Sequence, residues 1–153
     1  MNEYYKEKLE QGQEYQDFVS VVMIEKLKIP LLFFGSKKYQ YGVGENQQGI
    51  EIKFDDRLEE TGNLYIEVAE KTKAENQQYI SSGVMRNDNT WLYLIGNYNE
   101  IFVFDKKILK RMYLSKKHKE VEIPTSKGFL LKREVAKEWA ANHIDCRDIP
   151  RCL

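Results

Sequence analysis

Acidic side chains recur in the stretch 49–71, whose sequence is GIEIKFDDRLEETGNLYIEVAEK. Apolar and charged residues alternate in it, which predicts one strand over 50–55 and a second over about 64–71. Each strand then carries its charges on the face opposite its apolar residues. These charged residues are Glu51, Lys53 and Asp55 in the first strand and Glu67 in the second.

The link 56–63 ends in Thr61-Gly62-Asn63, a strong turn signal. If this link closes an antiparallel hairpin, the four charged residues face one side of it. Like charges across a hairpin are destabilising unless a cation compensates them, and Mg²⁺ held by carboxylate oxygens is one such cation. A solvated strand face shows the same alternation, so periodicity alone leaves both interpretations open.

The rest of the chain predicts the elements that would position this pair of strands. Apolar residues three and four apart predict a helix over 13–28, and the following Ile29-Pro30 terminates it. The nearly continuous apolar run 91–96 predicts a central strand buried on both faces. The further expected elements are a strand over 38–42, a partly helical stretch within 72–89, a strand over 101–105, a basic helix over 106–114, a strand over 121–123, and a helix over about 132–142 followed by a tail without a clear element.

These elements describe a mixed α/β (α+β) fold with the order αβββαβ in its first two thirds. In this order the strands 50–55 and 64–71 are the second and third. With an acid late on the former and another on the latter, the order is similar to that of the PD-(D/E)xK nuclease superfamily, which includes restriction endonucleases and Holliday-junction resolvases. The likeness covers roughly residues 12–105 and includes Ser82-Gly83-Val84 followed by Trp91. The layout is similar to that of small phage and mobile-element proteins of that group, and the resemblance implies a restriction-endonuclease-like core.

The resemblance implies a Mg²⁺-dependent (or Mn²⁺-dependent) nuclease that hydrolyses phosphodiester bonds in DNA. Asp55 and Glu67 would hold the metal, and Glu51 would be a further ligand. The family's lysine is expected two residues after Glu67, where this chain has Ala69. Lys53 is the replacement candidate, because it lies on the neighbouring strand and the same face, and its ammonium can reach the site from there. Lys71 is the next candidate.

Two alternatives stay open at this point. Glu51-Ile52-Lys53 is itself an E-x-K sequence, which would make Glu45 the first acid of a different register. The departure at Ala69 also favours a non-catalytic domain of the same fold, with a degenerate site, that binds nucleic acid or a protein.

A basic strip follows the predicted strand 101–105. It contains seven cations and no acid in fourteen residues: Lys106, Lys107, Lys110, Arg111, Lys116, Lys117 and Lys119. Such a strip could neutralise phosphates of duplex or branched DNA, although a solvated helix face has the same composition. The stretch 51–75 carries eight acids and four bases, so the chain total of 24 cations and 24 acids hides opposite local charges.

Length and composition narrow the classes further. The 153 residues predict a single domain, with a core over about 12–115 and a C-terminal β/α extension over about 116–153. No run is long and apolar enough for a membrane span, and two cysteines near the end favour a reducing cytoplasm. No phosphate-binding loop, H-E-x-x-H or G-x-S-x-G sequence occurs. A nuclease of this size often needs a second copy to cut both strands, so a homodimer is also an expectation.

Overall fold

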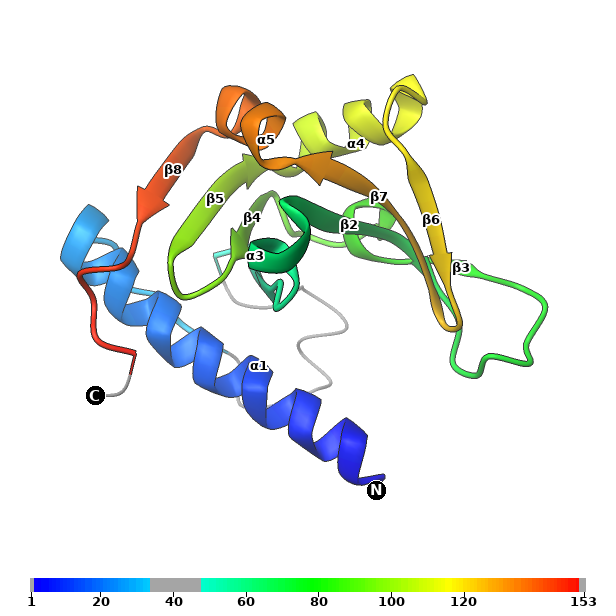
Figure 1. The fold of residues 1–153 in the computed structure, drawn as a ribbon, viewed down its shortest axis with the longest axis horizontal. Helices are drawn as coiled ribbons and strands as arrows, with labels where there is room; N and C mark the ends of the chain where they lie inside the picture. The colour runs from blue at the N-terminus through cyan, green and yellow to red at the C-terminus, as the bar shows by residue number, and fades with distance from the viewer. Residues whose placement is uncertain (1, 34–47, 152–153) are drawn as a thin grey trace.

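The computed structural model describes residues 2–33 and 48–151, which form three layers (Figure 1). A long N-terminal helix covers one face of a first sheet, and a second sheet packs on the other face. The first sheet has the order β1-β4-β5-β8 and the second the order β3-β2-β7-β6. The fold is therefore mixed α and β, as the sequence predicts.

The N-terminal layer is α1 (Glu3–Val22), which continues as a π-helical turn, η1 (Met23–Leu27). Asn2 caps its start, because the Asn2 side-chain oxygen accepts the Tyr4 backbone N–H at 3.0 Å. The buried residues recur three and four apart: Tyr15, Phe18, Val19, Val22 and Met23. The predicted helix over 13–28 is confirmed, and Gly12 does not interrupt it.

The first sheet is mixed. Its strands are β1 (Ile50–Phe54), β4 (Leu92–Gly96), β5 (Glu100–Asp105) and β8 (Asn142–Asp145). β1 runs parallel to β4, whereas the other two pairs are antiparallel. Alternate residues point to opposite layers: Ile52 and Leu94 pack toward α1, and Tyr93 and Phe104 pack toward the second sheet. β4 is thus buried on both faces, as predicted.

The second sheet is antiparallel. Its strands are β2 (Asn63–Glu70), β3 (Ile80–Ser81), β6 (Glu120–Ile123) and β7 (Ser126–Lys132). β2 and β7 form its centre, and Leu64 and Leu131 are fully buried against the first sheet. Two helices, α4 (Lys106–Ser115) and α5 (Arg133–Trp139), close one end of this core with Leu109, Met112 and Ala136.

The predicted hairpin is wrong. β1 pairs with β4, and β2 pairs with β3 and β7, so the two acidic strands lie in different sheets. A short helix, α3 (Leu58–Thr61), forms the link between them. Leu58 is fully buried in the core between the sheets, and this burial draws the link inward instead of closing a tight turn.

Two further differences concern the stretch 72–89 and the C-terminal tail. The stretch 72–89 contains only β3 and a single 3-10 turn, η2 (Gly83–Met85), in place of a partial helix. The tail that the sequence left without an element contributes β8, and residues 116–153 supply strands to both sheets. The strand expected over 38–42 lies outside the described residues.

Candidate functional site

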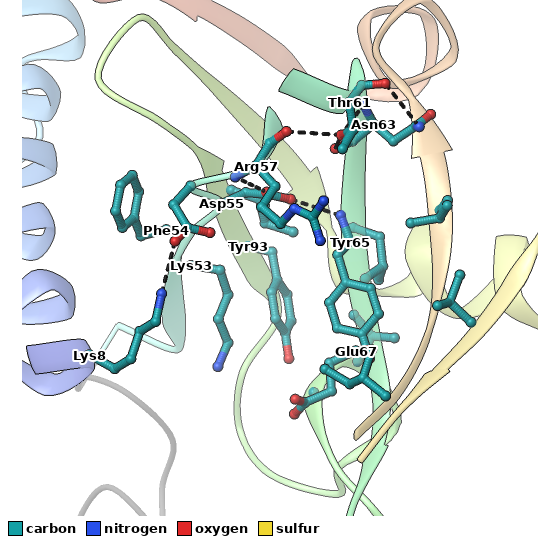
Figure 2. A pocket seen from close by; sticks show the side chains of 18 of the residues that line it. Lys8, Lys53, Phe54, Asp55, Arg57, Thr61, Asn63, Tyr65, Glu67 and Tyr93 are labelled. Atoms are coloured by element: carbon teal, nitrogen blue, oxygen red, sulfur yellow. Dashed lines mark hydrogen bonds and ion pairs between the residues drawn. The ribbon is translucent and has the colours of Figure 1, made fainter. Parts of the chain in front are cut away.

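A cavity of about 660 Å³ opens beside the end of β1 and the outer face of β2 (Figure 2). Its walls come from α1, β1, β2, β4, η2, β6 and β7. Three of the predicted site residues line it: Lys53, Asp55 and Glu67. The structure therefore brings them around one cavity, although they come from two sheets and not from one hairpin.

Glu67 lies on the face of β2 that points away from the buried core. One carboxylate oxygen accepts the Ser82 hydroxyl at 2.8 Å, and the other accepts the Ser126 hydroxyl at 3.1 Å. Both serines are buried, at 0% and 6% exposure, so the carboxylate is held by groups that cannot move far. No cationic partner of Glu67 is found among the described residues.

Gly83 explains why the Ser82 turn can approach β2 so closely. Its φ angle is +51°, in the left-handed region that favours glycine. A Cβ at this position would lie 2.2 Å from the Glu67 carbonyl oxygen. Glycine therefore lets η2 press directly against β2 at the residue that carries the acid.

Lys53 reaches the same end of the cavity from β1. Its ammonium lies 2.9 Å from a carboxylate oxygen of Glu51, whose side chain is 9% exposed, whereas the Lys53 side chain is 46% exposed. Glu51 does not line the cavity. It is buried next to Tyr93 of β4, on the face of the first sheet that packs against the second sheet. The predicted solvent face of β1 is thus buried at Glu51 and open at Lys53.

Tyr93 stands next to Glu51 on the neighbouring strand, and its side chain also lines the cavity. Burial, and then the Glu51 charge, raise the pKa of Tyr93 strongly, with a smaller contribution from Glu67. The hydroxyl therefore stays protonated and can donate a hydrogen bond. Figure 2 shows Lys53, Tyr93 and Glu67 pointing toward one end of the cavity.

Asp55 lies at the other end of the cavity, where its carboxylate accepts two backbone N–H groups. One of its oxygens accepts the Tyr65 N–H at 2.8 Å, and the other accepts the Arg57 N–H at 3.1 Å. Burial raises the pKa of Asp55, and these backbone donors oppose the shift. The carboxylate thus joins the end of β1 to the start of β2, a structural role that the sequence prediction did not include.

The three predicted metal ligands do not form one cluster. Within residues 2–33 and 48–151, no group of three or more acidic, histidine or cysteine side chains gathers as a metal site. Glu51, Asp55 and Glu67 are instead engaged separately, by Lys53, by backbone N–H groups and by two serines.

The remaining candidates of the site lie elsewhere. The Lys71 ammonium donates to the Asn76 carbonyl at 2.8 Å and lies 4.7 Å from the Tyr79 ring centroid, outside the cavity lining. Glu45, the first acid of the alternative register, lies outside the described residues. Ala69 is half-buried against the core between the sheets.

The basic strip is not a uniform surface. Lys106 is buried, and its ammonium lies 2.9 Å from Asp88 and 2.6 Å from the Arg86 carbonyl, so the expectation that it contacts phosphates is corrected. Lys116 pairs with Glu120 at 2.9 Å. Lys110 is half-buried, and the exposed members are Lys107, Arg111, Lys116, Lys117 and Lys119, none of which lines the cavity.

Sequence reasoning missed the partners of Glu67. Ser82 enters the sequence analysis only as part of the Ser82-Gly83-Val84 likeness, with no contact to Glu67 expected, and Ser126 sits in a segment with no distinguishing pattern. Comparison of the chain with protein-family models, curated proteins and solved structures found no match. No helix within the described parts of the chain is long and apolar enough to cross a membrane.

Proposed function

We propose that this protein is a Mg²⁺-dependent nuclease that hydrolyses phosphodiester bonds in DNA. The observation that carries the proposal is the end of the cavity toward which the Glu67 carboxylate, the Lys53 ammonium and the Tyr93 hydroxyl point, with the lysine paired to Glu51 at 2.9 Å. An acid, a cation and a neutral donor around one open space suit a phosphate and its counter-ion.

The donors at this end fit a hard cation. Mg²⁺ is typically bound by one or two carboxylates, and water and substrate phosphate complete its shell. Glu67 lines the cavity and supplies one such carboxylate, whereas Glu51 does not line it and is paired with Lys53. Bound at Glu67, the metal would polarise a phosphoryl oxygen and lower the pKa of a water molecule.

The chain's own residues would do the positioning. Ser82 and Ser126 fix the orientation of the Glu67 carboxylate by donating to its two oxygens. The Lys53 ammonium, now paired with Glu51, would neutralise charge that develops on the phosphate. The protonated Tyr93 hydroxyl would donate to a phosphate oxygen.

The proposal keeps the PD-(D/E)xK resemblance and changes its residues. Glu67 and Lys53 retain the roles that the resemblance implies, and Glu51 acts through its pair with Lys53. Asp55 is left out because it lies at the other end of the cavity, where its carboxylate joins the end of β1 to the start of β2. The packing of α1 on a mixed sheet is in keeping with a restriction-endonuclease-like core, whereas the placement of β1 and β2 in different sheets departs from the predicted hairpin. A cytoplasmic location and a homodimer belong to the same proposal.

A non-catalytic binding domain is the second candidate. The observation that favours it is that each predicted carboxylate already has partners within the fold, without a three-ligand cluster in the described chain. In that case the exposed cations of the basic strip would hold DNA or an acidic protein surface.

Cleavage of supercoiled and branched DNA in Mg²⁺ or Mn²⁺ separates the two candidates. Glu67→Gln removes the charge but keeps the shape, and we expect it to reduce cleavage more than about 100-fold, the loss that removal of an outer-shell group can already reach. Glu70→Gln is the matched control, because Glu70 is on the same strand, pairs with Arg86 at 3.1 Å and does not line the cavity.

Equal cleavage by the wild type and Glu67→Gln would contradict the proposed site. Binding of DNA by the wild type without cleavage in either metal would favour the non-catalytic domain.

A further inference from the structure

The wall of the cavity next to Glu67 is apolar. It is formed on the second sheet by Tyr65, Val121, Ile123 and Leu130, here called the apolar shelf. Ile123 is 45% exposed, and Val121 and Leu130 are partly exposed. An exposed apolar surface beside charged groups is a common feature of ligand sites, which combine apolar walls with a few polar groups.

The Tyr65 ring is held in place as part of this shelf. A Cβ at Gly128 would lie 2.7 Å from two of its ring carbons, so the ring lies directly over the glycine. Its hydroxyl hydrogen-bonds the Ser126 hydroxyl at 2.6 Å. A ring fixed at its centre and its tip can support a flat partner with little loss of side-chain entropy.

The shelf and the charged end are physically joined. Ser126 contacts the Tyr65 hydroxyl and also donates to Glu67, so one serine links the ring to the acid. Lys53 and Tyr93 face the same end of the cavity as Glu67 (Figure 2). An apolar flat surface adjacent to a cation and an acid matches the two halves of one nucleotide, its base and its phosphate.

We propose that the cavity takes an unpaired nucleotide of DNA, whose base lies on the apolar shelf while its phosphate lies at the Lys53 ammonium and meets Glu67 only through the proposed Mg²⁺. This inference rests on the proposed function and names its substrate class as single-stranded or locally unpaired DNA. In a continuous duplex both faces of each base are covered by its neighbours, so a base reaches such a wall only when it is unstacked. The cavity volume of about 660 Å³ lies within the range of small-molecule sites and suits one nucleotide.

Binding without cleavage provides the test. The affinity of a fluorescently labelled single-stranded oligonucleotide is measured by anisotropy in EDTA and compared with that of the duplex of the same sequence. We expect the single strand to bind more tightly. Removing bases from it at abasic sites is expected to weaken binding about fivefold or more, the size of one lost base–aromatic stack.

Ile123→Ser tests the shelf directly, and Ile80→Ser is its matched control, because Ile80 is 63% exposed on β3 and does not line the cavity. We expect Ile123→Ser to weaken single-strand binding while Ile80→Ser leaves it unchanged. Equal affinity for single strand and duplex, no loss at abasic sites, or equal behaviour of the two variants would overturn the inference.

The outcomes also separate this inference from the nuclease proposal. Glu67-dependent cleavage of fully paired DNA without a preference for single strands would leave the nuclease and remove the shelf as a base site. A base-dependent preference for single strands, with no cleavage in Mg²⁺ or Mn²⁺, would support the shelf and contradict the nuclease.

Discussion

Lys53 and Lys106 are two lysines for which the sequence suggests phosphate-directed roles, and the fold gives them opposite surroundings. Each ammonium lies 2.9 Å from a carboxylate, Glu51 in one case and Asp88 in the other. The side chains of Lys106 and Asp88 are 9% and 4% exposed, whereas Lys53 is 46% exposed and lines the cavity. Lys106 also donates to a backbone carbonyl.

The difference shows that an ion pair of the same length can belong to the core or to a site. Removing one partner of a buried ion pair is costly, mainly because the other partner is then an uncompensated buried charge. A pair that opens on a cavity can exchange its partner for water or for a ligand. Lysine counts along the chain do not distinguish these two cases.

The largest effect is expected from Lys106→Met, which keeps the side-chain bulk and leaves Asp88 buried without its cation. We expect the free energy of unfolding to fall by about 3–5 kcal/mol at neutral pH. Urea denaturation followed by circular dichroism measures this change. A loss below about 1 kcal/mol would mean that the pair behaves like a surface ion pair.

Acidification should reduce this difference between the variant and the wild type. Burial acts to raise the pKa of Asp88, but the Lys106 ammonium and the Thr90 N–H outweigh it and hold the pKa below its usual value. A carboxylate with a lowered folded-state pKa stabilises the fold above its unfolded pKa of about 4, and this stability is lost as the pH falls through the folded value. The gap between the two proteins should therefore be widest near neutrality and narrow below about pH 4.

Lys53→Met should affect both stability and cleavage. Because the Glu51 carboxylate is only 9% exposed, removing its cationic partner is costly, and we expect a loss of stability of about 1–3 kcal/mol, below that of Lys106→Met because Lys53 itself is 46% exposed. Cleavage in Mg²⁺ should fall about 100-fold, or about 2.7 kcal/mol of barrier, because the charge facing the phosphate is gone. Parallel denaturation and cleavage assays measure both quantities. A large loss of stability with unchanged cleavage would mean that Lys53, like Lys106, serves the core and not the site.

The types of the elements could be predicted from the sequence because they depend on local periodicity. The stripe of α1, the alternation in β1 and β2 and the apolar run of β4 are visible in short windows, and the structure has a helix and strands there. The pairing of β1 and β2 could not be predicted in the same way. Which layer the apolar face of each strand joins depends on distant residues, and here β1 packs on α1 while β2 packs between the sheets.

The candidate site shows the same limit. Glu67 and Lys53 were predicted from their types and positions, and both line the cavity. Ser126 contacts Glu67 across 59 residues of sequence, and no local pattern marks such a contact. Asp55 is expected to bind metal only because of the family resemblance. Its bond to the Tyr65 N–H, ten residues along the chain, depends on how β1 and β2 are placed in the fold.

Asp55→Ala tests that structural assignment. The Tyr65 and Arg57 N–H groups lose their acceptor, and we expect the free energy of unfolding to fall by about 1–2 kcal/mol. Asp56→Ala is the matched control, because Asp56 is exposed and forms a surface pair with Lys8 at 2.9 Å, so it should change stability by less than about 1 kcal/mol. If Asp55→Ala is as stable as Asp56→Ala, the backbone bonds of Asp55 contribute little.

The smallest effect is expected at the exposed part of the basic strip, and it completes the contrast with Lys106. Lys117→Gln combined with Lys119→Gln should leave stability unchanged, because both side chains are exposed. If the strip lies along DNA, each lost phosphate contact lowers the slope of log affinity against log salt by about 0.7–0.9. Anisotropy titrations in EDTA at several salt concentrations measure that slope. An unchanged slope in the double variant would mean that these lysines, unlike Lys106, serve neither the core nor the DNA and only keep the surface solvated.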